Sequence, residues 1–116
     1  MAAESTVATD LLQRDPKLAE IVRRLVEALQ PERIYVFGSK ARGDEDPDSD
    51  YDLMVIVSAD AGPTSQLSQR VHSLLWGLGI AADILVWTRE AFESRLHLKA
   101  SFPSTIVREG KLLYVA

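Results

Sequence analysis

The stretch from Gly38 to Val57 limits the fold of this chain more than any other part of its sequence. Gly38-Ser39 follows a short apolar run, residues 33–37, and Asp50 and Asp52 open a second one, residues 51–57. Successive side chains of a strand point to opposite faces, so Asp50 and Asp52 share one face and Tyr51 lies on the other. Two unit charges about 4 Å apart at an effective dielectric near 20 repel by roughly 4 kcal/mol. A bound cation removes that repulsion, so the pair predicts a Mg²⁺ site beside a tight turn.

A third carboxylate interrupts the otherwise apolar run at residues 81–87, where Asp83 needs a partner or a metal ion. If this strand lies beside residues 51–57, Asp83 reaches the same site as Asp50 and Asp52. Three such carboxylates can hold two Mg²⁺ ions, one for an attacking hydroxyl and one for a triphosphate. The alternative is that Asp83 ends a strand at the surface.

The Gly38-Ser39 pair can hold phosphate. Glycine permits a tight turn and lets backbone N–H groups approach an oxyanion, and the Ser39 hydroxyl adds a donor. A helical turn near residues 40–42 would direct its positive end to the same place. A Gly-Ser pair alone means little, but it gains weight from the two aspartates that follow it.

The remaining pattern predicts an α/β (α+β) fold with a mixed sheet of three to four strands flanked by helices. Asp15-Pro16 can start a helix that Pro31 stops, and its apolar residues form one continuous stripe. The strands near residues 51–57 and 81–87 are joined through a helix, which favours a parallel or mixed sheet. Helices are expected at 16–29, 64–77, 88–98 and 103–109, and strands at 33–37, 51–57, 81–87 and 112–115.

The composition limits the class of protein. The 116 residues suit one domain, expected over 15–116 after a flexible or partly helical tail at 1–14. A net charge of −4 argues against sequence-independent nucleic-acid binding. Without cysteine there is no disulfide and no thiolate site, and the sequence contains no membrane-length apolar run and no signal-peptide pattern at its start. A cytoplasmic protein is expected. Trp76 and Trp87 are interpreted as packing residues rather than base-stacking platforms.

The residues from Gly38 to Asp44 and from Ser49 to Val55 resemble the signature of the DNA polymerase β-like nucleotidyltransferase superfamily. That pattern has an apolar strand, Gly-Ser, a spacer of about ten residues, two aspartates separated by one residue, and a third Asp on a later strand. The similarity extends to the minimal nucleotidyltransferase (MNT) family, known as antitoxin partners of HEPN-domain toxins. Two positions depart from the usual pattern: Lys40 stands where Arg is frequent, and Tyr51 stands where an aliphatic residue is usual.

The resemblance implies Mg²⁺-dependent transfer of AMP from ATP to a tyrosine of a HEPN-type RNase toxin, with pyrophosphate as the leaving group. It implies that Asp50, Asp52 and Asp83 are the catalytic and metal-binding residues. By position, Gly38 and Ser39 would hold the β- and γ-phosphates, with Arg42 and Lys40 neutralising their charge. Tyr51 is expected to face away from the site and to pack.

Two other interpretations remain open on the sequence, and a third is excluded. The chain could neutralise a toxin by stoichiometric binding with a vestigial metal site, or it could transfer a nucleotide to a small molecule. A calcium-binding loop at 44–55 fails the EF-hand template, because Ser49 stands where Gly is needed and Val55 where Glu is needed. The carboxylates of this segment are interpreted as a solvated acidic loop: Asp44, Glu45, Asp46 and Asp48.

Overall fold

The computed structural model describes residues 7–42 and 50–116. The predicted acidic loop lies outside them. The elements follow one another in the expected order, with an additional helix at the N-terminal end and a short 3-10 helix after β2. They are α1 (Thr9–Arg14), α2 (Pro16–Leu29), β1 (Arg33–Phe37), α3 (Ser39–Arg42), β2 (Tyr51–Val57), a short 3-10 helix (Ala59–Ala61), α4 (Thr64–Leu75), β3 (Ala82–Thr88), α5 (Arg89–Glu93), α6 (Phe102–Glu109) and β4 (Lys111–Val115).

The four strands form one mixed sheet in the order β3-β2-β1-β4. β1 pairs antiparallel with both β2 and β4, whereas β2 and β3 are parallel. The parallel pair is the one whose strands are joined through α4, as a crossover connection requires. The predicted fold class, an α/β or α+β fold with a mixed sheet flanked by helices, is confirmed.

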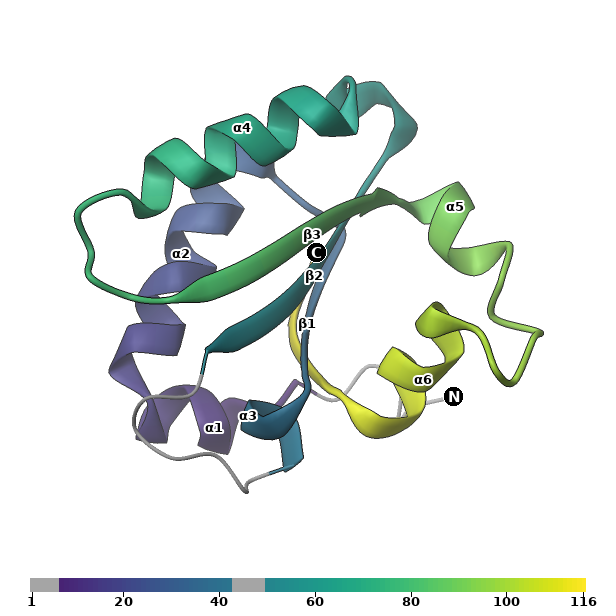
Figure 1. Cartoon of the computed structure of the whole chain (residues 1–116), viewed down its shortest axis with the longest axis horizontal. Coiled ribbons are helices and arrows are strands. Elements are labelled where there is room, and N and C mark those ends of the chain that lie inside the picture. Colours follow the sequence, from purple (N-terminus) through teal and green to yellow (C-terminus); the bar gives the residue numbers. More distant parts are fainter. Residues whose placement is uncertain (1–6, 43–49) are drawn as a thin grey trace.

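Helices cover both faces of the sheet (Figure 1). One face, called here the α2 face, packs against α1, α2 and α4, and its core includes Leu18, Leu25 and Leu53, none of which is exposed. The other, the α6 face, packs against α5 and α6 through a smaller cluster that includes Met54, Phe92 and Ile106. Since β1 and β2 are central and covered on both sides, nine of their twelve residues are buried.

The N-terminus of α2 forms as its sequence predicts. Pro16 occupies the first helical turn, and the Asp15 carboxylate accepts a hydrogen bond from the Leu18 N–H at 3.2 Å. This cap satisfies one of the donors that a helix start leaves without a partner. Ahead of it, α1 lies within the segment expected as a flexible or partly helical tail, and its Leu11 is buried in the core.

The second and third predicted helices are shorter than expected. α4 ends at Leu75, and Trp76, interpreted from the sequence as a packing residue, is 88% exposed; that prediction is wrong. Trp87 does pack, against Phe92 and Phe102. α5 ends at Glu93, and residues 94–100 continue in turns whose side chains are exposed. In the described part of the chain, no helix has the length and apolar character needed to cross a bilayer.

Candidate active site

Successive side chains of β2 point to opposite faces of the sheet, so one set packs in the core of the α2 face and the other lies on the α6 face. Tyr51, Leu53, Val55 and Val57 belong to the core cluster of the α2 face, whereas Met54 belongs to that of the α6 face. By the two-residue period of a strand, Asp52 lies on the α6 face with Met54. Tyr51 is only 6% exposed, so the prediction that it faces away from the aspartates and packs is confirmed.

Asp83 lies directly beside Asp52. The two are paired positions of the parallel strands β2 and β3, and both are on the α6 face because Leu85 and Trp87, two and four residues after Asp83, join its cluster. The strand carrying Asp83 is thus the neighbour of the strand carrying Asp52, which is the condition under which Asp83 could reach the same site. Asp50 precedes β2 and is exposed, as is Asp83, whereas Asp52 is half-buried.

The pKa of Asp52 is raised above its ordinary value of 3.8, first because burial penalises the charged carboxylate and then because of the negative charges of Asp83 and Asp50. No described Lys, Arg or His forms an ion pair with any of the three. Among the described side chains, the site therefore concentrates negative charge on one face with no cation paired to it.

The three carboxylates lie near one another but do not converge on a point. Within residues 7–42 and 50–116, no group of three or more His, Cys, Asp or Glu side chains is arranged as a set of metal ligands. The donor set nevertheless fits a hard cation by its chemistry, since carboxylate oxygens are what Mg²⁺ prefers and repulsion between them favours a cation.

Gly38 is in direct contact with this charge cluster. β1 pairs with β2 so that Phe37 lies opposite Asp52, and Gly38 follows with a positive φ of 74°. A Cβ built on Gly38 would lie 2.5 Å from Oδ2 of Asp52. Only glycine allows both this backbone conformation and this approach, so the structure brings together the Gly-Ser turn and the aspartate pair.

The residues after Gly38 form the four-residue helix α3. Ser39 and Arg42 belong to it, but their side chains lie outside the described part of the structure. Lys40 is 7% exposed, and its ammonium lies 4.5 Å from the centroid of the Tyr51 ring. Because Tyr51 packs on the α2 face, the Lys40 charge lies on the opposite side of β2 from the Asp52 carboxylate.

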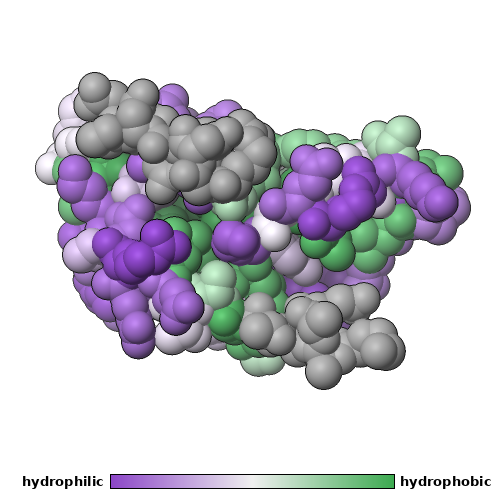
Figure 2. Space-filling model, turned by 90° about the horizontal axis from the view of Figure 1, so that it is seen from below, coloured by the Kyte–Doolittle hydropathy of each residue, from purple (hydrophilic) through white to green (hydrophobic). Residues whose placement is uncertain are grey.

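A hollow of about 180 Å³ opens beside Gly38, between the end of β1 and α6. Phe37 and Phe102 meet edge to face in its wall, with ring centroids 5.3 Å apart, and Thr105 and Glu109 add polar atoms. Figure 2 views the molecule from the end at which β1 runs into α3. Hydrophobic residues cross the middle of that surface, and hydrophilic residues gather on either side of it. No sequence pattern indicates this hollow, since it depends on how α6 packs against β1.

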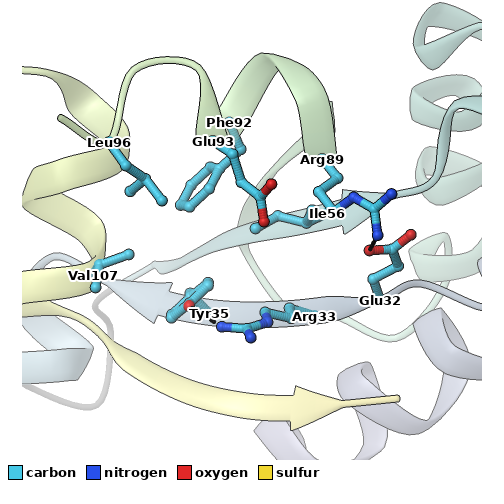
Figure 3. Close-up of a pocket in the computed structure, with 9 residues that line it drawn as sticks. All are labelled: Glu32, Arg33, Tyr35, Ile56, Arg89, Phe92, Glu93, Leu96 and Val107. Atoms are coloured by element: carbon cyan, nitrogen blue, oxygen red, sulfur yellow. Dashed lines mark hydrogen bonds and ion pairs between the residues drawn. The ribbon is translucent and has the colours of Figure 1, made fainter. Parts of the chain in front are cut away.

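A second hollow, of about 160 Å³, lies on the same face of the sheet toward the other end of β2 (Figure 3). Its apolar wall includes Ile56, Phe92 and Leu96, and Glu32 and Arg89 form an ion pair of 3.2 Å at its rim. Ile56 is four residues along β2 from Asp52, or about 13 Å at the rise of a strand. This hollow is therefore separate from the carboxylates, and no motif in the sequence indicated it.

Comparison with known proteins identifies the family. A family model described as a nucleotidyltransferase domain matches residues 16–113. The chain is 30% identical over 82 residues to the protein MJ0604 of Methanocaldococcus jannaschii, named as a candidate protein adenylyltransferase; the match covers 71% of this chain and 77% of that protein.

Two solved structures are also similar. A crystal structure of a candidate nucleotidyltransferase from Sulfolobus solfataricus aligns with a TM-score of 0.60 at 24% identity, covering 93% of this chain and 86% of the other. This likeness supports the fold. A structure described as a toxin-antitoxin with AMP-PNP aligns with a TM-score of 0.48 at 22% identity over 84% of this chain and 73% of the other.

The family model spans most of the chain, including both central strands, the Gly-Ser turn and the strand of Asp83. This protein therefore belongs to the nucleotidyltransferase domain family, which confirms the resemblance to a minimal nucleotidyltransferase drawn from its sequence.

Proposed function

We propose that this protein is a Mg²⁺-dependent protein adenylyltransferase that transfers AMP from ATP to a tyrosine hydroxyl of a HEPN-type RNase toxin, and thereby acts as its antitoxin. The observation that carries the proposal is the pairing of Asp52 with Asp83 on one face of the sheet, with Gly38 against the Asp52 carboxylate. Transfer to a protein is supported by the identity with MJ0604, whose name describes that activity. The toxin partner rests on the resemblance in the sequence motif.

In the proposed reaction the acceptor hydroxyl oxygen forms a bond to the α-phosphorus of ATP, and the bond from that phosphorus to the oxygen bridging the β-phosphate breaks. Pyrophosphate leaves, and the hydroxyl proton passes to Asp83 as the general base. Asp50, Asp52 and Asp83 would hold Mg²⁺, which when bound offsets the charge of the triphosphate and favours ionisation of the hydroxyl.

The turn after β1 would bind the triphosphate. Gly38 and Ser39 offer backbone N–H groups and a hydroxyl to the β- and γ-phosphates, with Arg42 supplying positive charge. Gly38 is suited to this role because it has no side chain between the turn and Asp52. A cation held by the carboxylates would supply positive charge to phosphates bound at this turn.

The test follows label from ATP to protein. The chain, purified with the partner that it retains from its native cells, is incubated with Mg²⁺ and either α-³²P- or γ-³²P-ATP, and label is followed on a denaturing gel. We expect label from the α position alone, at the size of the partner. The double variant Asp50→Asn, Asp52→Asn should lose it entirely, and the control Asp60→Asn, an exposed residue of the 3-10 helix, should keep it.

Three results would contradict the proposal. Label transferred at the wild-type rate by the double variant would show that these aspartates are not the site. Absence of label while the partner stays bound would favour stoichiometric neutralisation of a toxin. Label recovered only in a small molecule would place the acceptor outside proteins.

A further inference from the structure

The two residues that depart from the usual motif are in contact with each other. The Lys40 ammonium lies 4.5 Å from the centroid of the Tyr51 ring. Among the described residues, Lys40 is the one charged residue that is buried. A buried ammonium needs compensation for its lost hydration, and the face of an aromatic ring supplies part of it. An aliphatic residue at position 51 would leave that compensation out.

A third residue completes the contact. The Tyr51 hydroxyl lies 2.9 Å from both carboxylate oxygens of Asp15, so it donates its hydrogen bond to that carboxylate. Asp15 also caps α2 through the Leu18 N–H. Tyr51 is thus held at its ring by Lys40 and at its hydroxyl by the start of a helix packed firmly in the core.

We name Asp15, Lys40 and Tyr51 the anchor cluster. Its members come from the start of α2, from α3 and from the first residue of β2. Lys40 is two residues after Gly38, and Tyr51 lies between Asp50 and Asp52. The cluster therefore connects the phosphate-binding half of the motif to its carboxylate half from the opposite face of the sheet.

We propose that the anchor cluster positions the turn at Gly38–Arg42 against Asp50 and Asp52, and that Lys40 acts through Tyr51 rather than by contacting the triphosphate. The inference rests on the proposed function, because it assigns a role within that site. A fixed turn is what a triphosphate and a shared cation need, since a displacement of about 1 Å is enough to weaken a site of this kind.

A double-mutant cycle tests the coupling. The variants are Lys40→Met, Tyr51→Leu and the pair together, with Lys99→Met as a matched control that removes an exposed charge. The readouts are the Kd for a non-hydrolysable ATP analogue with saturating Mg²⁺, measured by calorimetry, and the KM for ATP in transfer to the partner. We expect each single variant to weaken nucleotide binding roughly tenfold, and the double variant to weaken it no further than the worse single.

Conservative variants separate positioning from a role in stability alone. Lys40→Arg keeps a cation over the ring and leaves the hydrogen bond of Tyr51 to Asp15 intact, so its Kd should stay within about threefold of wild type. Tyr51→Phe keeps the ring under Lys40 but loses the hydrogen bond to Asp15, so its Kd should lie between those of wild type and Tyr51→Leu. A purely structural cluster would lower the melting temperature of Lys40→Met and Tyr51→Leu but leave the Kd unchanged well below the transition. That result would overturn the inference.

The remaining outcomes are also decisive. A loss of binding in Lys40→Met without one in Tyr51→Leu would make Lys40 a direct phosphate ligand, and single effects that multiply in the double variant would mean independent roles. If wild type binds the analogue but transfers nothing, the proposed function fails while the cycle still decides the role of the cluster. If wild type binds no nucleotide, both are wrong.

Discussion

At the scale of single residues, the site depends on a contact between a glycine and a carboxylate. Gly38 has a φ of 74°, and its missing side chain is what leaves Oδ2 of Asp52 room at the end of β1. Glycine is favoured at this position for two reasons: its backbone adopts a positive φ, and it has no Cβ to clash with the Asp52 carboxylate. The two can be separated by experiment, because Gly79 has a similar φ of 68° with nothing within 4 Å of a built Cβ.

We predict that Gly38→Ala abolishes nucleotidyl transfer, because its Cβ displaces Asp52 from the turn. Gly79→Ala should retain transfer. Both should lose about 1–2 kcal/mol of stability from the positive φ alone, measured by urea unfolding. Equal activities in two equally destabilised variants would show that the contact of Gly38 with Asp52 has no part in the reaction.

Predictions from the sequence were also least complete for the contacts of single side chains. Alternation in a strand placed Asp52 and Tyr51 on opposite faces correctly, because that period is local. The approach of Lys40 to Tyr51, the reach of Tyr51 to Asp15, and the exposure of Trp76 depend on packing between distant segments. No pattern of neighbouring residues carries that information.

At the scale of elements, the apolar runs predicted all four strands to within a residue or two of their bounds. Predictions of helix ends were weaker. The helix expected over 88–98 stops at Glu93, and the side chains of residues 94–100 are exposed, so little burial favours a longer helix. The start of the helix was predictable because Thr88 is a favourable capping residue, and its hydroxyl accepts a hydrogen bond from the Ala91 N–H. The length of the helix depends on burial, which the local sequence does not show.

The difference in burial between the central strands and residues 94–100 predicts a pattern of amide hydrogen exchange. β1 and β2 pair on both sides and are covered on both faces, so their amides should exchange only through opening whose free energy approaches that of global unfolding. Residues 94–100 are held by turn hydrogen bonds in exposed backbone and should exchange with free energies near zero. Exchange followed residue by residue with NMR measures both. Strong protection of residues 94–100 in the isolated chain would contradict this assignment.

At the scale of the whole molecule, the site works against the stability of the fold. Folding half-buries Asp52 beside Asp50 and Asp83 and raises its pKa above 3.8. Between its pKa in the unfolded chain and the raised pKa, the folded chain binds more protons than the unfolded one. The free energy of unfolding therefore falls as the pH rises from about 3.8 through the raised pKa, and that loss persists at neutral pH.

We therefore predict that Asp52→Asn raises the free energy of unfolding at pH 7 when no divalent cation is present, with the advantage vanishing below about pH 3.8. Added Mg²⁺ should stabilise wild type and leave the variant unchanged, because only wild type would bind the ion at this site. Urea unfolding at several pH values, with and without Mg²⁺, measures this. Asp60→Asn is the control, and an Asp52→Asn variant less stable than wild type at pH 7 would show that the carboxylate makes a favourable contact instead.

The alternation of β2 has a consequence for how this chain can change length over evolutionary time. A single inserted or deleted residue between Asp52 and Val57 would exchange the two faces for everything on one side of it. It would move carboxylates into the packed interior or leucine and valine onto the surface that carries Asp52 and Asp83. Descendants of this sequence can replace residues within the strand one by one, but a single residue gained or lost there preserves both faces only if a β-bulge absorbs it.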